Sequence, residues 1–349
     1  MFMEFHILQS FPLNCLNRDD LGQPKTVRIG GVTRARISSQ CWKRQIRLTL
    51  PAFGVQCGIR SRQFAPLIAD CIIRQSPGEP ISAAAAQECA DRIASLMGAD
   101  NMCFLTFAEL DLLASLAKDA SWDPKKIEKK AIDKLSTRFA KSKGTHDALD
   151  VALFGRMIAK ADQLNVEACA SFAHSFTTHA ISTDFDYFTA VDDLDPKGLS
   201  GHIGLNGFSA GVFYRYIVLD VTQLAHTLGL KDNPDVLVQA VEAFTKALYT
   251  ALPQARQTTM SAHSPWSYAH VLIRDGWPLQ AGFEKPVQAI AGSGLLGPSI
   301  KALEADLALQ EKLSGSLYGK KTDFIMGEEN PISIDELAKA LGEEARKVC

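Results

Sequence analysis

The chain has 349 residues, of which 46% are hydrophobic and 22% charged, with a formal net charge of −2. These values are typical of a globular protein, and the length allows two domains or one domain with large insertions. No run of about 18 apolar residues occurs, so no membrane span is expected. The N-terminus lacks the features of a signal peptide and none of the eight cysteines forms a CxxC pair, so a cytoplasmic protein with reduced thiols is expected.

A basic segment runs from Asn17 to Arg47. It carries eight basic residues against two acidic ones, a net charge of +6, so the rest of the chain sums to −8. A positive island on a mildly acidic chain indicates a polyanion that is bound at one place. A solvated basic face without a ligand is the alternative.

The first part of this region reads as a strand followed by a basic turn. The N-terminal stretch MFMEFHILQSF is strand-like, and Gly30-Gly31 is typical of a turn. Alternation over Thr33–Ile37 places Arg34 and Arg36 on one side of a short extended segment.

A basic helix is predicted next, with Ser38-Ser39 as its N-cap and its end near Pro51. We expect Trp42, Ile46 and Leu50 to pack inward. The free N–H groups and the positive dipole at the start of such a helix suit a phosphate. The polar face opposite the inward residues carries Gln40, Lys43, Arg44 and Arg47.

From about Cys57 to Asn165 the pattern is helical, and no strand is predicted there. We expect helices over 82–97, 106–120, 123–143 and 147–163, which form an inserted helical subdomain. The third of these helices exposes a lysine cluster that suits duplex DNA, a solvated helix face being the alternative. The cluster consists of Lys125, Lys126, Lys129 and Lys130.

The pattern then changes to strands. Ile181–Val191 and Val212–Val218 flank a glycine-rich stretch, which predicts a long β-hairpin with a glycine-rich tip. Further along, 233–252 reads as a helix, Val271–Arg274 as a strand, and about the last 60 residues as helix and loop.

Several short motifs, in this order and spacing, resemble one family. They are LNRDDLGQPK at Leu16–Lys25, GGVTRARISSQ at Gly30–Gln40 with Lys43-Arg44, ALFGRM at Ala152–Met157, AHSFTTH at Ala173–His179, DFDYFTAVDDL at Asp184–Leu194, FYRY at Phe213–Tyr216 and AGFEKPV at Ala281–Val287. Together they resemble the CasC family, the repeated backbone subunit of the type I-E CRISPR surveillance complex called Cascade. The resemblance runs from Met3 to about Leu296.

The resemblance implies an α+β, hand-shaped subunit. Its palm would be an RNA-recognition-motif-like, ferredoxin-like sheet formed by residues 1–55, 166–185 and 217–349, the last part including a C-terminal helical region. Residues 56–165 would form helical fingers, and 186–216 a β-hairpin thumb. The aromatic signature of RNA-recognition motifs is missing, so base stacking on the sheet is not expected.

The same resemblance implies a subunit without catalytic activity, cofactor or metal. Several copies would polymerise along the spacer of a CRISPR RNA, hold its phosphates without reading sequence, and present its bases to target DNA in antiviral defence. The partners implied are the CRISPR RNA, target DNA, about six copies of the chain itself, and the large, small, CRISPR-RNA-processing and 5′-handle-binding subunits of Cascade. The residues implied to hold RNA are Arg18, Lys25, Arg34, Arg36, Ser38, Ser39, Gln40, Lys43, Arg44, Arg47, Leu205 and Phe208.

The thumb would reach over the RNA of a neighbouring subunit, kink the strand and flip one base. Its expected tip, Gly204–Ala210, carries Leu205 where the family has a hydroxyl residue. Phe208 is expected to pack under the neighbouring subunit, with stacking on a displaced base as the alternative.

Two other functions stay open. Asp19 and Asp20 lie in the loop whose aspartate cuts target RNA in the related type III backbone subunits, so a metal-dependent ribonuclease of a type III-like effector is the alternative enzyme. We expect instead that these two aspartates have a structural role and pair with Arg18 or Arg34. A plain RNA-binding module that acts as a monomer is the third hypothesis. His174 and His179 are expected to be core or hydrogen-bonded histidines.

Overall fold

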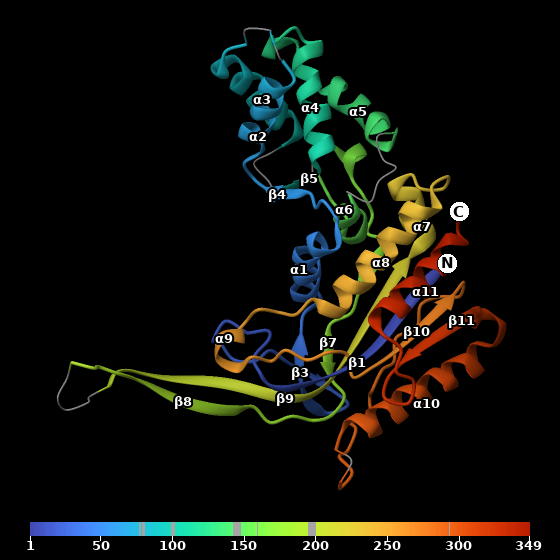
Figure 1. The fold of residues 1–349 in the computed structure, drawn as a ribbon. Helices are drawn as coiled ribbons and strands as arrows, with labels where there is room; N and C mark the ends of the chain where they lie inside the picture. Colours follow the sequence, from blue (N-terminus) through green and yellow to red (C-terminus); the bar gives the residue numbers. More distant parts are fainter. Residues whose placement is uncertain are drawn as a thin grey trace. The chain divides into compact units, whose positions relative to one another are not determined.

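The computed structural model describes residues 1–76, 78, 81–98, 102–141, 148–158, 160–194, 200–292 and 294–349. Its ribbon is shown in Figure 1. The chain divides into two compact units. The first comprises Met1–Thr49, Ser171–Val218 and Lys246–Leu337, and the second Leu50–Ala170, Leu219–Thr245 and Ala338–Cys349. The block expected to form the fingers lies inside the second unit.

The first unit is built around a β-sheet. Its strands are β1 (Phe2–Asn14), β2 (Thr26–Ile29), β3 (Val32–Ile37), β6 (Ala170–Phe172), β7 (Ser175–Thr177), β8 (Asp184–Val191), β9 (Ser200–Asp220), β10 (Tyr268–Arg274) and β11 (Lys320–Met326). Among the described residues the strand order is β11-β10-β1-β9-β7-β3-β2, and β6 and β8 also pair with β9. The pairs β1–β10, β10–β11, β3–β7 and β7–β9 are antiparallel. The expected α+β class is confirmed.

Side chains of β9 alternate between two covered faces of the sheet. Tyr214 and Tyr216 share a core cluster with Leu303 of α10 (Leu296–Ser314). The intervening Arg215 is stacked 3.7 Å from the ring of Trp42, which belongs to α1 (Ser39–Thr49). Because both tyrosines are at most 8% exposed, they lie too deep to stack on bases.

Helix α10 is fastened to the sheet through His270. The Nδ1 atom of His270 lies 2.9 Å from Glu304 of α10, and its Nε2 atom lies 2.9 Å from Asp323 of β11. Burial lowers the pKa of His270, but the bonds and charges of the two carboxylates outweigh burial and raise this pKa above its ordinary value.

The raised pKa of His270 predicts a pH-dependent stability. The stabilisation is fully present below the unfolded pKa, about 6.5, and is lost as the pH rises through the higher folded pKa. We expect the free energy of unfolding to fall above about pH 6.5, and to fall less in a His270→Gln variant. Urea denaturation across this range measures both slopes, and identical slopes would contradict the assignment.

The predicted turn at Gly30-Gly31 joins β2 to β3, and both glycines have positive φ angles of 59° and 79°. A Cβ on Gly30 would overlap the backbone carbonyl of Glu284, whereas a Cβ on Gly31 would meet nothing within 4 Å. We expect Gly31→Ala to lower the free energy of unfolding by about 1 kcal/mol through backbone strain. Gly30→Ala should cost roughly 3 kcal/mol, because backbone must also move. Denaturation of the two matched variants tests this, and equal losses would show that the turn is not packed against Glu284.

The expected hairpin forms from β8 and the first part of β9, and it projects from the rest of its unit (Figure 1). The register pairs Asp184 with Phe208 and Val191 with Ser200, so the chain reverses between Val191 and Ser200. The expectation that Gly204–Ala210 forms the tip is therefore wrong. Residues 195–199 lie outside the described residues.

The glycines that led us to expect a tip lie within strand β9, where Gly204 leaves room for a side chain of the paired strand. A Cβ on Gly204 would overlap the ring of Phe188 on the paired strand β8. A glycine at this position lets an aromatic ring lie across the strand.

The second unit contains helices around a core of its own. Its main helices are α2 (Phe64–Arg74), α3 (Ala83–Met97), α4 (Phe107–Asp119) and α5 (Lys129–Lys141). Ser82 caps the start of α3, and Gly98 ends it in the left-handed conformation. Thr106 and Glu109 form a capping box at α4. The helices expected over 82–97 and 106–120 are thus confirmed.

Three expectations about this unit are wrong. A short antiparallel pair, β4 (Ile59–Ser61) with β5 (Cys103–Leu105), occurs where no strand was expected. The helix expected from Asp123 is broken into a 3₁₀ turn, η2 (Pro124–Lys126), and α5, because Ile127 is extended and its side chain is buried in the core. The helix expected over 147–163 is only α6 (Leu149–Phe154), which ends at Gly155 with a φ of 73°. Asp147, its expected start, lies outside the described residues.

The remaining elements complete the chain. They are η1 (Leu50–Phe53), η3 (Asp162–Leu164), α7 (Val221–Leu228), α8 (Pro234–Thr250), α9 (Gln257–Met260), η4 (Gly315–Tyr318) and α11 (Ile334–Arg346). Helix α8 confirms the helix expected over 233–252. The expectation of helix and loop alone near the C-terminus is wrong, because β11 is a strand of the sheet. This strand could not be predicted, since it lies at the edge of the sheet and begins with polar, exposed residues that hide the alternating pattern. No helix in the described part of the chain is long and apolar enough to span a bilayer.

Candidate nucleic-acid interface

A tight loop, residues 17–25, connects β1 to β2 within the basic segment. The Lys25 N–H donates to the Asn17 carbonyl at 2.8 Å and closes the loop. Asp19 Oδ1 accepts the N–H groups of Leu21 and Gln23, each at 2.9 Å. The backbone of the loop, rather than an arginine as expected, therefore holds Asp19.

The loop is bonded to the start of α1. Asn17 Oδ1 accepts the Ser38 N–H at 2.9 Å, and the Arg36 N–H donates to the Lys25 carbonyl at 2.8 Å. Ser38 Oγ accepts the Cys41 N–H at 3.3 Å, which confirms Ser38 as the N-cap. The loop and the helix start are thus held together as one surface.

Helix α1 is anchored by its apolar side. Trp42 and Ile46 are at most 2% exposed, as expected, and Leu50, the first residue of η1, is also buried. The indole N–H of Trp42 donates to Ser175 Oγ at 2.8 Å. Because this side is fixed on the sheet, the side that carries Gln40 and Arg44 remains exposed.

Five cations on this surface have no carboxylate within salt-bridge distance in the part of the chain that the structure describes. We call them the basic strip: Arg18, Lys25, Arg36, Lys43 and Arg44. Burial raises the pKa of the Cys41 thiol, and the charges of Lys25 and Arg44 partly offset that rise, so both cations lie close to Cys41. Unpaired cations held near one another repel, and a polyanion relieves that repulsion.

His174 joins the basic strip to a neighbouring strand end. It is exposed, and its Nδ1 lies 3.0 Å from Arg36 Nη1. A guanidinium only donates, so the His174 Nδ1 accepts this bond. Burial lowers the pKa of His174, and Arg36 and Lys25 lower it further. His179 is buried and its Nε2 accepts the Val212 N–H at 3.2 Å. Both histidines are hydrogen-bonded, as expected.

Lys43 lies partly against an aromatic ring. Its Nζ is 5.5 Å from the centroid of Phe172, and burial lowers the pKa of Lys43. A cation within about 6 Å of a ring centroid is attracted to the ring face, so Phe172 helps to position the charge of Lys43.

Arg34 does not belong to the interface. Its side chain is 0% exposed, and its guanidinium donates to the carbonyls of Thr177 and Phe283 at 2.9 Å and of Glu284 at 3.4 Å. The expectation that Arg34 holds RNA is therefore wrong. Both arginines belong to β3, but the backbone of Phe283 and Glu284 covers Arg34, whereas Arg36 lies beside the exposed His174.

The other expected RNA-binding residues lie in several environments. Ser38 and Ser39 are only 8% and 9% exposed. Arg47 is half-buried on α1. Leu205 is 43% exposed and Phe208 half-buried, both on β9 and away from the hairpin turn.

The base of the hairpin nevertheless lies against the loop. A Cβ on Gly207 of β9 would overlap the side-chain oxygen of Gln23. The structure thus brings the strand that carries Leu205 and Phe208 close to the loop of the basic strip. The lysine cluster (Lys125, Lys126, Lys129 and Lys130) is exposed, as expected, on η2 and α5 of the second unit.

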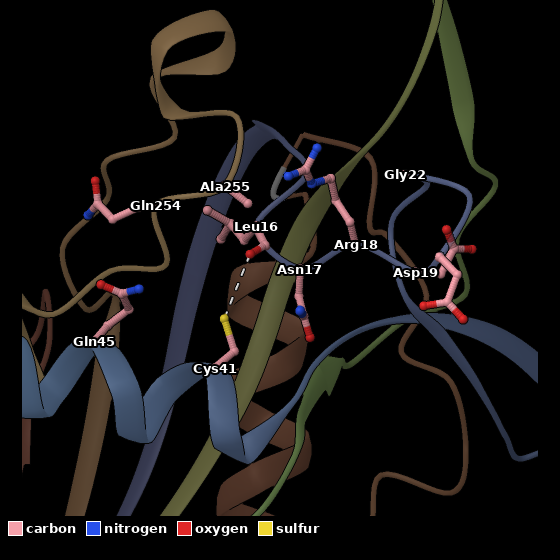
Figure 2. Close-up of a pocket in the computed structure, with 10 residues that line it drawn as sticks. Leu16, Asn17, Arg18, Asp19, Gly22, Cys41, Gln45, Gln254 and Ala255 are labelled. Atoms are coloured by element: carbon pink, nitrogen blue, oxygen red, sulfur yellow. Dashed lines mark hydrogen bonds between the residues drawn. The ribbon is translucent and has the colours of Figure 1, made fainter. Parts of the chain in front are cut away.

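A cavity of about 500 Å³ opens beside the loop (Figure 2). Its lining includes Arg18 and Asp20 from the loop, Gln45 from α1, and Gln254 and Ala255 from the segment between α8 and α9. That last segment follows the loop by more than 200 residues, and nothing in its sequence pattern marks it as part of a site. No group of three or more metal-ligating side chains occurs among the described residues.

The fold and the site define an α+β protein with an unpaired basic surface on one loop and one helix. Residues 3–347 match the family described as CT1975-like protein, and the chain belongs to this family. No curated protein matches the chain.

Chains of solved structures share the fold, among them two chains of CRISPR RNA-guided surveillance complexes. A chain of a "CRISPR RNA-guided surveillance complex, pre-nicking" has a TM-score of 0.78 and 24% identity, with 99% of this chain and 100% of that chain covered. A chain of a "CRISPR RNA-guided surveillance complex" has a TM-score of 0.72 and 21% identity, with the same shares covered. The likeness extends over nearly the whole of each chain.

Proposed function

We propose that this protein is the CRISPR-RNA-binding backbone subunit of a type I-E Cascade complex. The observation that carries the proposal is the basic strip, five unpaired cations on a loop and helix that the fold holds together. The similar fold of chains from CRISPR RNA-guided surveillance complexes supports membership in such a complex. Several copies coat one RNA, and its bases then pair with target DNA.

The strand order supports a palm like an RNA-recognition motif. Four strands, β10-β1-β9-β7, are adjacent in this order, with α1 following β1 in the chain and α8 following β9. This is the βαββαβ pattern of ferredoxin-like domains. Because α10 covers the tyrosine-bearing face, RNA binds at the loop and helix rather than on the sheet.

The residues of the basic strip suit a guide of any sequence. Arginine and lysine attract phosphates without reading bases, so the base edges stay free for pairing. The hairpin extends to a neighbouring copy, where Leu205 and Phe208 contact that copy or its RNA. The lysine cluster contacts target DNA. Asp19 is structural, because its Oδ1 accepts two backbone N–H groups of its own loop.

Size-exclusion chromatography with RNAs of increasing length tests the backbone role. We expect the number of bound copies to rise stepwise with RNA length, because each copy covers a fixed segment. One copy on every RNA would indicate a module that acts alone. Cleavage of the RNA on addition of magnesium would indicate the metal-dependent ribonuclease that uses Asp19 and Asp20.

A further inference from the structure

The cavity beside the basic strip is lined by a carboxylate, a negative charge that repels phosphate. Asp20 lines the cavity, is exposed, and has no hydrogen-bond or ion-pair partner among the described residues. Its neighbour Asp19 is explained by the loop, since it accepts two backbone N–H groups. Asp20 has no such role, and a carboxylate beside a phosphate path weakens the binding of a polyanion.

Two carboxamides complete the polar lining of the cavity. Gln45 extends from α1, and Gln254 lies on the loop opposite (Figure 2). The Gln254 Nε2 donates to the Leu252 carbonyl at 2.9 Å, which leaves its Oε1 as an acceptor. The side chain of Gln45 has no partner in the described part of the chain and offers both a donor and an acceptor.

A carboxylate only accepts hydrogen bonds, so its ligand must donate one. Phosphate oxygens and sugar ring oxygens only accept. If the bases of a bound strand are left free for pairing, the 2′-hydroxyl is the donor that an RNA backbone offers and a DNA backbone lacks. Gln45 and Gln254 lie across the cavity from the loop that carries the aspartates (Figure 2), so a carboxamide there can serve the hydroxyl of another ribose, since a hydroxyl both donates and accepts.

We propose that this cavity receives the ribose edge of the bound strand and that Asp20, Gln45 and Gln254 select RNA over DNA through the 2′-hydroxyl. The inference rests on the proposed function, because it concerns the strand held by the basic strip. Phosphate contacts supply affinity for either nucleic acid, and the cavity supplies the distinction between them. Asp20 contributes twice, since it accepts from the hydroxyl and repels a strand that cannot donate.

The test compares three labelled single strands of one sequence by fluorescence anisotropy: RNA, DNA and 2′-fluoro RNA. The last keeps an RNA-like backbone but cannot donate from the 2′ position. We expect the wild-type chain to bind RNA about tenfold more tightly than either of the others, the effect of roughly one charge-assisted hydrogen bond. Asp20→Ala should raise the affinity for DNA and leave the affinity for RNA unchanged or lower. The ratio of the RNA affinity to the DNA affinity should therefore fall towards one. Gln254→Leu should lower this ratio as well.

Two control variants separate the sources of an effect. Asp70→Ala removes an exposed carboxylate of α2 and should leave the ratio unchanged. Arg18→Ala should weaken all three strands alike. Equal wild-type affinities for RNA and 2′-fluoro RNA, or an undiminished ratio in Asp20→Ala, would overturn this inference while leaving the proposed function intact. Binding of none of the three strands would overturn the proposed function itself, and the inference with it.

Discussion

Replacing Lys25, Lys43 and Arg44 together with alanine is expected to lower affinity for single-stranded RNA roughly 100-fold at low salt, about 1 kcal/mol for each lost charge-assisted contact. The three cations have no carboxylate partner in the described residues, so the chain loses no ion pair when they are removed. The salt dependence should become shallower by about two units of log–log slope. Anisotropy titrations over a series of salt concentrations measure both quantities.

The sequence of the RNA provides a sharp control for this triple variant. Because the contacts are to phosphates, the loss should be the same for every guide sequence. A loss confined to some sequences would refute recognition through the backbone alone. A matched triple, with Lys125, Lys126 and Lys129 changed to alanine, removes the same charge from the second unit. It should retain the guide RNA and weaken only the binding of target DNA.

Arg34→Ala is expected to lower the free energy of unfolding by about 3 kcal/mol, without a direct loss of RNA contacts. The buried guanidinium of Arg34 bonds three carbonyls, and its removal deprives the buried carbonyls of Thr177 and Phe283 of this donor. Chemical denaturation of the isolated chain measures this loss.

Arg44 is the matched control for Arg34, because both belong to the same basic segment of the sequence. The exposed Arg44 should change the free energy of unfolding by less than about 0.5 kcal/mol when replaced with alanine, but should weaken RNA binding. If Arg44→Ala proved as destabilising as Arg34→Ala, the division between structural and binding arginines would be wrong.

Elements of the fold that depend on residues close together in the sequence could be predicted. The cap at Ser38, the inward side of α1 and the glycine turn before β3 follow from residue types at short spacings. The tip of the hairpin could not be predicted, because glycine favours turns but also admits a ring lying across a strand. Gly204 serves Phe188 in that second way.

The positive charge of the site could be predicted from the sequence, but the residues that are exposed there could not. The sequence shows how many cations lie in the basic segment, but contacts with distant segments decide which are buried. The carbonyls of Thr177 and Phe283 hold Arg34 in the core. Arg36 on the same strand lies instead beside the exposed His174. The cavity depends on Gln254, which only the folded chain brings to the loop. Contacts between segments so distant in the chain leave no periodic signal in a single sequence.

In the proposed function several copies of this chain hold one guide RNA. Native mass spectrometry of the full chain, co-expressed with a CRISPR array and the genes that neighbour its own, is the decisive test of this assembly. We expect a large particle in which several copies of this chain share a single RNA. A monomer free of RNA would contradict the proposed function.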